Sequence, residues 1–359
     1  MQPVSDALER TGATRRLPFV IRFFQFFESL GVLVMLAIVV GVTSALDQNF
    51  FTGPNLTHLA ITASVMAVAG LGMTFAIAMR GFDLSVGSTQ LLTAGVAATF
   101  LGAIKLPAPE ISLFGLVTLP SYVVSIAGAV VGTLVVGLLV GLVNGLIISK
   151  LRVPAFVATL GMMSIVRGVA LLYTKGQHIV IRQDEYAWLN NGKVAEVIPM
   201  PLVIALGTLA LLYLLLQHTP FGRHVCAVGG NEAAAIAAGL NVDRITLAVF
   251  GLVGVTAALS GVMLSSQLMI VEAGLGAGFE LQVIAISVLG GTSLSGGAGN
   301  LPGTLFAALL LAAINSALNF LKVKDYYQYL AWGLLLILAL GIDALRRIAI
   351  SKAVTGSSR

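Results

Sequence analysis

The chain has 359 residues, of which 58% are hydrophobic and only 10% are charged. A soluble domain carries about 25% charged residues, so this composition excludes a soluble protein and predicts a chain that lies in a lipid bilayer. The formal charge is +5, but lysine and arginine occur at predicted helix ends rather than in clusters with aromatic residues, which argues against a nucleic-acid partner. The single Cys226 excludes an internal disulfide.

Apolar runs separated by proline, glycine and charged residues predict about ten membrane-spanning helices, each of roughly 20 residues. The clearest cover 29–46, 59–79, 123–148, 155–174, 245–270 and 327–345, and four weaker ones cover 86–104, 199–216, 281–294 and 302–321. The predicted fold class is therefore an all-α, polytopic membrane protein with a single transmembrane domain at 29–345.

Two tails flank this domain. Residues 1–28 are predicted to form an N-terminal tail, in which Phe19, Phe23, Phe26 and Phe27 share one helical face and indicate a short helix in the membrane interface. The frayed start of the first span explains the same pattern equally well. Residues 346–359 form the C-terminal tail. Most lysines and arginines fall on the side of both tails, so the positive-inside rule predicts that both termini are cytoplasmic.

Glycine recurs every four positions in the span at 123–148. The residues concerned are Gly128 and Gly132, then Gly137, Gly141 and Gly145. Small residues at this spacing let two helix backbones approach closely. A contact within the chain is favoured over a seam between two copies.

Two short sequence echoes suggest internal symmetry. Residues 84–87 resemble residues 294–297, and residues 142–144 resemble residues 313–315 in a span predicted to run in the opposite direction. The second echo indicates an inverted internal repeat. The two echoes imply different symmetries, so at most one of them reflects a true repeat.

Chemistry that would indicate other protein classes is missing from the predicted spans. The four histidines fall in loops or at span ends, so a buried serine has no base for intramembrane hydrolysis. Carboxylates also lie at the edges, and Arg167 is the charged residue well inside a span. Gly192 and Lys193 precede Val194, which does not fit a phosphate-binding loop. We expect no catalytic residue, no metal site and no cofactor bound by this chain. Any ATP that drives transport must therefore be used by another subunit. The alternative is an ion-coupled secondary transporter of a small polar solute.

Residues 81–88 read GFDLSVGS and resemble the GIDLSVGS stretch of ribose-type sugar permeases. The likeness continues through 143–145, 150–163, 219–223, 229–234 and 289–297, and covers roughly 55–345. Arg80, Phe82 and Gln282 stand where the family often has glycine, isoleucine and aspartate, which bears on substrate identity rather than on class. The motif residues interpreted as turns are Gly81, Asp83, Ser85, Gly87, Gly291, Ser293, Gly296 and Gly297.

The chain thus resembles the membrane permease subunit of a ribose-type monosaccharide importer of the ATP-binding-cassette class. The resemblance implies two cytoplasmic ATP-binding cassette subunits that use the ATP, and a periplasmic substrate-binding protein that delivers the sugar. It also implies a second permease subunit, identical or related, and a location in the bacterial inner membrane, surrounded by lipid.

The segment at 217–244 is predicted to be a cytoplasmic coupling loop. Asn231 can cap a helix from Glu232 to Ala238 that Gly239 ends, and the alanines give this helix a small, smooth surface. Given the resemblance, we expect it to dock into a cleft of the ATP-binding subunit; an ordinary capped loop helix is the alternative. The expected coupling residues are Gly229, Gly230, Asn231, Glu232, Ala233 and Ala234.

A sugar offers hydroxyls rather than charge, so the translocation path should be neutral and polar. Side chains of this kind in the predicted spans are Asn144, Thr159, Asn315 and Asn319. Each can instead bond a neighbouring helix, which is the common role of such residues in membranes.

Overall fold

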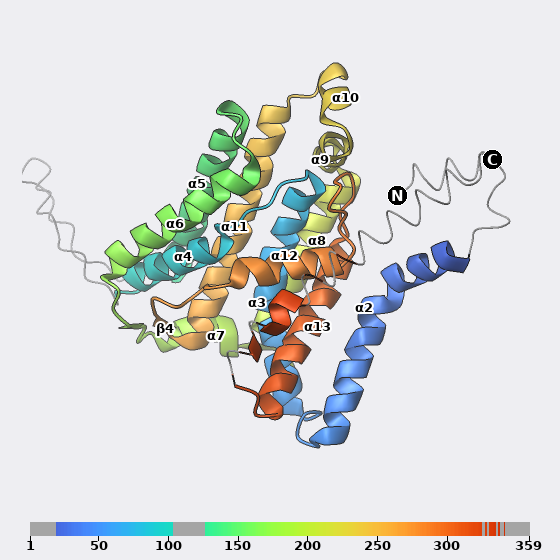
Figure 1. The fold of residues 1–359 in the computed structure, drawn as a ribbon. Helices are drawn as coiled ribbons and strands as arrows, with labels where there is room; N and C mark the ends of the chain where they lie inside the picture. Colours follow the sequence, from blue (N-terminus) through green and yellow to red (C-terminus); the bar gives the residue numbers. More distant parts are fainter. Residues whose placement is uncertain are drawn as a thin grey trace, which may run out of the picture.

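A computed structural model describes residues 19–102, 126–324 and a few positions between 327 and 341. The described chain is helical almost throughout (Figure 1). The long helices are α2 (Phe19–Leu46), α3 (Gly53–Ala78), α4 (Val86–Phe100), α5 (Ile126–Lys150), α6 (Ala155–Thr174), α8 (Met200–His218), α11 (Val242–Leu268) and α13 (Leu301–Phe320). The short helices are α7 (Asp184–Asn191), α9 (Pro220–Gly230), α10 (Glu232–Ala237) and α12 (Phe279–Leu289).

Helix α3 is the centre of the bundle. In its most apolar stretch 83% of the residues are buried, against 22% in α5 and α8 and 28% in α6. Polar side chains tie it to its neighbours: Ser260 Oγ on α11 donates to Val65 O at 2.8 Å, and Thr74 and Thr304 hydroxyls lie 2.9 Å apart between α3 and α13. The exposed apolar faces of α5, α6 and α8 suit contact with lipid or with another membrane chain.

Glycines bring α5 and α11 into direct backbone contact. A Cβ atom on Gly141 would lie 2.1 Å from Phe250 O, and one on Gly254 would lie 2.0 Å from Gly137 O. Gly145 meets Leu247 in the same way, while Gly132 packs against the ring of Phe100 on α4. The prediction of a contact within the chain is confirmed for these glycines.

Within the described residues, six helices are long and apolar enough to cross a membrane: α3, α5, α6, α8, α11 and α13. The apolar part of α2 covers Gly31–Leu46. A count of about ten spans is not confirmed. Most of the predicted span at 327–345, residues 1–18 of the N-terminal tail and the tail at 346–359 lie outside the described residues.

Two of the weaker predicted spans are wrong as full crossings. The span at 86–104 is the 15-residue α4, which ends before Gly102 at φ +72°, and the span at 281–294 is the 11-residue α12. Gly278 precedes α12 and Gly291 follows it, and both have the positive φ, +75° and +91°, that glycine adopts readily. At 1.5 Å per residue α12 is about 16 Å long, roughly half the hydrocarbon thickness of a bilayer.

The segment between α6 and α8 is folded rather than an open loop. Strand β1 (Ile179–Val180) pairs with β4 (Ile270–Val271), and β2 (Lys193–Val194) pairs with β3 (Ile198–Pro199). On α7, the fully buried Tyr186 contacts Val262 O at 3.0 Å and Ser265 Oγ at 2.7 Å through its hydroxyl. Burial raises the pKa of Tyr186 to about 12. This segment therefore anchors the end of α11.

Candidate functional site

The GFDLSVGS motif forms a buried polar cluster with α5 and α6. Asp83, 2% exposed, accepts hydrogen bonds from Ser85 N at 2.8 Å and from Ser85 Oγ at 2.6 Å. Asn144 Nδ2 on α5 lies 2.9 Å from Ser85 Oγ and 3.3 Å from Asp83 Oδ2. Thr159 on α6 donates to Phe82 O at 3.1 Å. Two predicted path residues, Asn144 and Thr159, therefore bond the motif segment to neighbouring helices.

Among the described residues, Asp83 has no basic partner in this cluster. Burial raises the pKa of its carboxyl above the ordinary value, and the hydrogen bonds from Ser85 and Asn144 oppose that rise. The buried Asn144 Oδ1 has no partner among the described residues. Asn144 therefore presents its amide nitrogen to Asp83, and the pair depends on one side being a donor and the other an acceptor.

We expect that exchanging these two groups will separate their roles. In Asp83→Asn the carboxamide oxygen is still needed as the acceptor for Ser85 N, so the new amide nitrogen faces Asn144 Nδ2, and the variant should cost about 1–3 kcal/mol; Asn144→Asp places two carboxyls together. The double variant Asp83→Asn/Asn144→Asp restores a donor and an acceptor and should recover part of the lost thermal stability. Thermal unfolding of the detergent-solubilised protein measures this, and equal losses in the double variant would contradict the pairing.

A second meeting point joins the end of α3, the end of α9 and the turn between α12 and α13; we call it the Arg80 junction. Arg80 donates from Nε to Ser295 O at 2.5 Å and from Nη2 to Gly230 O at 2.8 Å. Gly297 N donates to Ala78 O at 2.8 Å. Three segments far apart in sequence are thus held by one side chain and one backbone bond.

The Arg80 junction has no room for larger residues. A Cβ atom on Gly229 would lie 1.8 Å from Ala78 O, and one on Gly296 would lie 2.4 Å from Gly229 O. Gly296 and Gly297 have φ of +77° and +82°, and Arg80 itself has φ +62°, a conformation that costs about 1–3 kcal/mol for a residue with a side chain. Gly291 likewise has positive φ, and all three glycines lie between α12 and α13. Arg80, which directly precedes the GFDLSVGS motif, has left-handed φ, and Gly81 does not.

The segment predicted to be a coupling loop contains two short helices, α9 and α10. Asn231 Oδ1 accepts from Ala234 N at 3.0 Å and caps α10, and Gly239 with φ +83° follows it. The sequence did not predict α9, which Thr219 caps. Gly229 and Gly230 are the last residues of α9, and Gly229 is buried in the Arg80 junction. Glu232, Ala233 and Ala234 are exposed on α10, at one end of the bundle (Figure 1).

Arg167 on α6 holds the segment between β4 and α12. It donates to Ala273 O at 3.2 Å and to Leu275 O at 3.4 Å. In the same segment a Cβ atom on Gly276 would lie 2.1 Å from Gly87 O. Gly87 is inside the first turn of α4 and not in a turn between elements, which corrects its interpretation as a turn residue. Because Gly87 has no side chain, the segment between β4 and α12 can lie directly against the backbone of α4.

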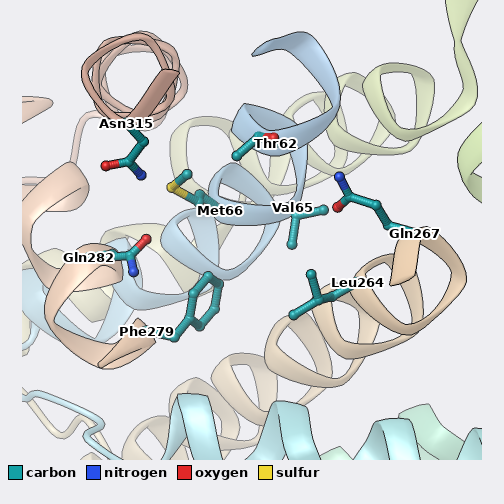
Figure 2. Close-up of a pocket in the computed structure, with 8 residues that line it drawn as sticks. All are labelled: Thr62, Val65, Met66, Leu264, Gln267, Phe279, Gln282 and Asn315. Carbon is teal, nitrogen blue, oxygen red and sulfur yellow. The ribbon is translucent and has the colours of Figure 1, made fainter. Parts of the chain in front are cut away.

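A cavity of about 170 Å³ lies between α3, α11, α12 and α13. Figure 2 shows the carboxamides of Gln282 and Asn315 on one side of it and that of Gln267 on the other. The described residues that line it are Thr62, Val65, Met66, Leu264, Gln267, Phe279, Gln282 and Asn315. Of the four predicted path residues, Asn315 alone lines the cavity, because Asn319 is exposed and accepts from Gln328 Nε2 at 2.8 Å. The sequence analysis did not propose Gln267 or Gln282 as path residues, although a glutamine within an apolar helix is a signal of this kind.

Comparison with known proteins identifies close relatives. The family model described as branched-chain amino acid transport system / permease component matches residues 55–340. The ribose import permease protein RbsC of Escherichia coli K12 is 38% identical over 316 residues, which cover 87% of this chain and 92% of that protein. The L-arabinose ABC transporter permease protein AraH of Azospirillum brasilense is 33% identical, covering 90% of each chain. The D-allose transport system permease protein AlsC of E. coli K12 is 32% identical, covering 94% and 97%. No solved structure matches the chain.

Proposed function

Because this chain belongs to the family of branched-chain amino acid transport system permease components, and its relatives are sugar permeases, we propose that it forms the membrane path of a monosaccharide importer driven by separate ATP-binding cassette subunits. The chain is the permease subunit of a sugar importer of this class. The geometry of the α9–α10 segment and the Arg80 junction supports the proposed energy coupling.

Helix α10 is the proposed docking element for the ATP-binding subunit. Its exposed residues are small apart from Glu232 and Ile236, so the helix can enter a groove without steric conflict. Glu232 is in its first turn, where the helix dipole favours a negative side chain. Movement of α10 reaches α9 directly, and α9 is bonded to Arg80 and packed against Ala78. Docking at one end of the bundle would thereby move α3 and the α12–α13 turn.

Ala234→Arg should uncouple transport without unfolding the protein. The added side chain is long and charged, it lies on the exposed face of α10, and a mismatched charge in a docking groove is costly. We expect sugar uptake and binding-protein-stimulated ATP hydrolysis to fall at least about tenfold, a loss of roughly 1.4 kcal/mol in effective coupling, at unchanged expression. Uptake into proteoliposomes containing the assembled transporter measures this.

Ala234→Ser is the matched control, because it keeps a small side chain at the same place and should transport normally. An uncoupler added to the same vesicles should leave ATP-driven uptake running. Normal uptake by Ala234→Arg would refute docking at α10, and uptake that follows an ion gradient without ATP would refute the importer itself.

The remaining assembly follows the same proposal. A periplasmic binding protein delivers the sugar, a second permease subunit completes the path, and this chain binds no cofactor, nucleic acid or ATP of its own. We place both termini and the α9–α10 segment in the cytoplasm, consistent with the excess of basic residues predicted on that side. The six described spans would belong to a domain of about ten helices over 29–345, with the inverted repeat suggested by Asn144 and Asn315.

A further inference from the structure

We propose that the cavity between α3, α11, α12 and α13 is a transient binding site for a neutral, hydroxyl-rich solute such as a monosaccharide; this rests on the proposed transport function. The cavity is lined by three carboxamides and one hydroxyl, with Val65, Met66, Leu264 and Phe279 between them. Its volume of about 170 Å³ far exceeds the roughly 10–15 Å³ that one water molecule needs.

Most polar side chains of the cavity are left without a hydrogen bond to the described part of the chain. Within the described part of the chain, the side chains of Thr62, Gln267 and Gln282 form no hydrogen bond. Asn315 accepts from Trp332 Nε1 at 2.8 Å through Oδ1, which leaves its amide nitrogen for another acceptor. Gln282 is only 8% exposed. These unpaired polar groups face the cavity, where they can bond an occupant that both donates and accepts hydrogen bonds.

The lining disfavours charged solutes and favours solutes that form hydrogen bonds. Among the described residues that line the cavity there is no lysine, arginine, aspartate or glutamate. An ion there would have no charged partner among these residues to offset the cost of its desolvation. A carboxamide carries two donors and one acceptor oxygen, and a sugar hydroxyl is both donor and acceptor. Phe279 projects into the space in Figure 2 and offers an apolar surface to the C–H face of a sugar ring. Phosphorylated sugars would be rejected.

The walls of the cavity are connected to the Arg80 junction. Helices α3, α12 and α13 each supply lining residues, and their opposite ends include Ala78 and the turn with Ser295, Gly296 and Gly297. A displacement of α9 at the Arg80 junction therefore shifts three of the four walls. This connection gives the site a route to release its occupant when the coupling segment moves.

Trp332 offers a direct test, because it is bonded to Asn315 and the chain has two tryptophans. In the full chain carrying Trp188→Phe, D-ribose and L-arabinose should change Trp332 fluorescence saturably, with a half-maximal concentration of about 1–10 mM. Gln282→Met and Gln267→Met, which keep side-chain length but remove hydrogen bonding, should each weaken binding about fivefold. Ribose 5-phosphate should produce no saturable change.

Gln90→Met is the matched control. Gln90 is a fully buried glutamine whose Nε2 already donates to Ser260 Oγ at 2.9 Å outside the cavity, so its loss should lower thermal stability and leave sugar binding unchanged. The site would be overturned if Trp332 fluorescence stayed unaltered up to about 100 mM sugar, which is 100-fold above the lower expected value. It would also be overturned if Gln282→Met bound the sugar as tightly as the parent. Neither result would contradict the proposed importer function, because that function is tested separately by ATP-driven sugar uptake.

Discussion

Replacing Gly141 with leucine should leave little folded protein in the membrane. The Cβ atom alone would lie 2.1 Å from Phe250 O and 2.9 Å from Phe250 C, and these are backbone atoms that cannot rotate away. Helices α5 and α11 would have to separate along a contact that Gly137, Gly141 and Gly254 share. In lipid this contact depends on close packing rather than on a hydrophobic driving force, so overpacking should cost at least about 3 kcal/mol.

Size-exclusion chromatography of a fluorescently tagged chain after mild detergent extraction measures that loss. Gly207→Leu on α8 is the control, because a Cβ atom at Gly207 meets nothing within 4 Å, and its elution peak should match the parent. Gly141→Ala should be intermediate. A monodisperse, normally stable Gly141→Leu protein would show that α5 and α11 are not in contact in the membrane.

Arg80→Ala should reduce ATP-driven uptake about tenfold or more while the protein still inserts. The variant loses the bonds from the guanidinium to Ser295 O and Gly230 O. Such charge-assisted bonds are worth about 1.5–3 kcal/mol each when buried, and less here because Arg80 is exposed. Alanine also keeps the unfavourable φ of +62°. Uptake by the reconstituted transporter, normalised to the amount of protein, measures the effect.

Arg80→Gly separates the effect of the lost guanidinium bonds from the effect of the strained backbone. Glycine adopts positive φ without strain but cannot bond Ser295 or Gly230. If the backbone conformation alone matters, Arg80→Gly will transport like the parent; if the guanidinium transmits movement, this variant will stay below it and above Arg80→Ala. We expect the second result, with thermal stability close to the parent. Full uptake by Arg80→Ala would contradict a role for the Arg80 junction.

Features with a local signal could be predicted from the sequence. The long apolar runs identified α3, α5, α6, α8, α11 and α13, the four-residue glycine spacing predicted that α5 packs closely on another helix without saying which one, and Asn231 with Gly239 identified α10. Each of these depends on residues within one or two helical turns. The short α4 and α12 misled the prediction because apolar composition does not distinguish a half-length buried helix from a full span.

Features that depend on distant residues could not be predicted. Asn144 and Asp83 are 61 residues apart, and Arg80 and Ser295 are 215 apart, so periodicity carries no information on their pairing. The same limit explains why Asn315 lines the cavity while Asn144 and Thr159 bond the motif segment. All three are polar residues in apolar helices, and only the packing of other helices decides which one faces open space.

The central position of α3 also has a consequence for how the protein is made. Ser260, which bonds α3 at Val65, follows it by 195 residues, and Thr304, which contacts Thr74, follows by 230. At about 5–20 residues per second of synthesis, α3 leaves the ribosome on the order of ten seconds or more before these partners exist. During that interval its hydroxyl-bearing faces must be shielded by the insertion machinery or by earlier helices, so the most buried of the described spanning helices is made well before the partners that bury it.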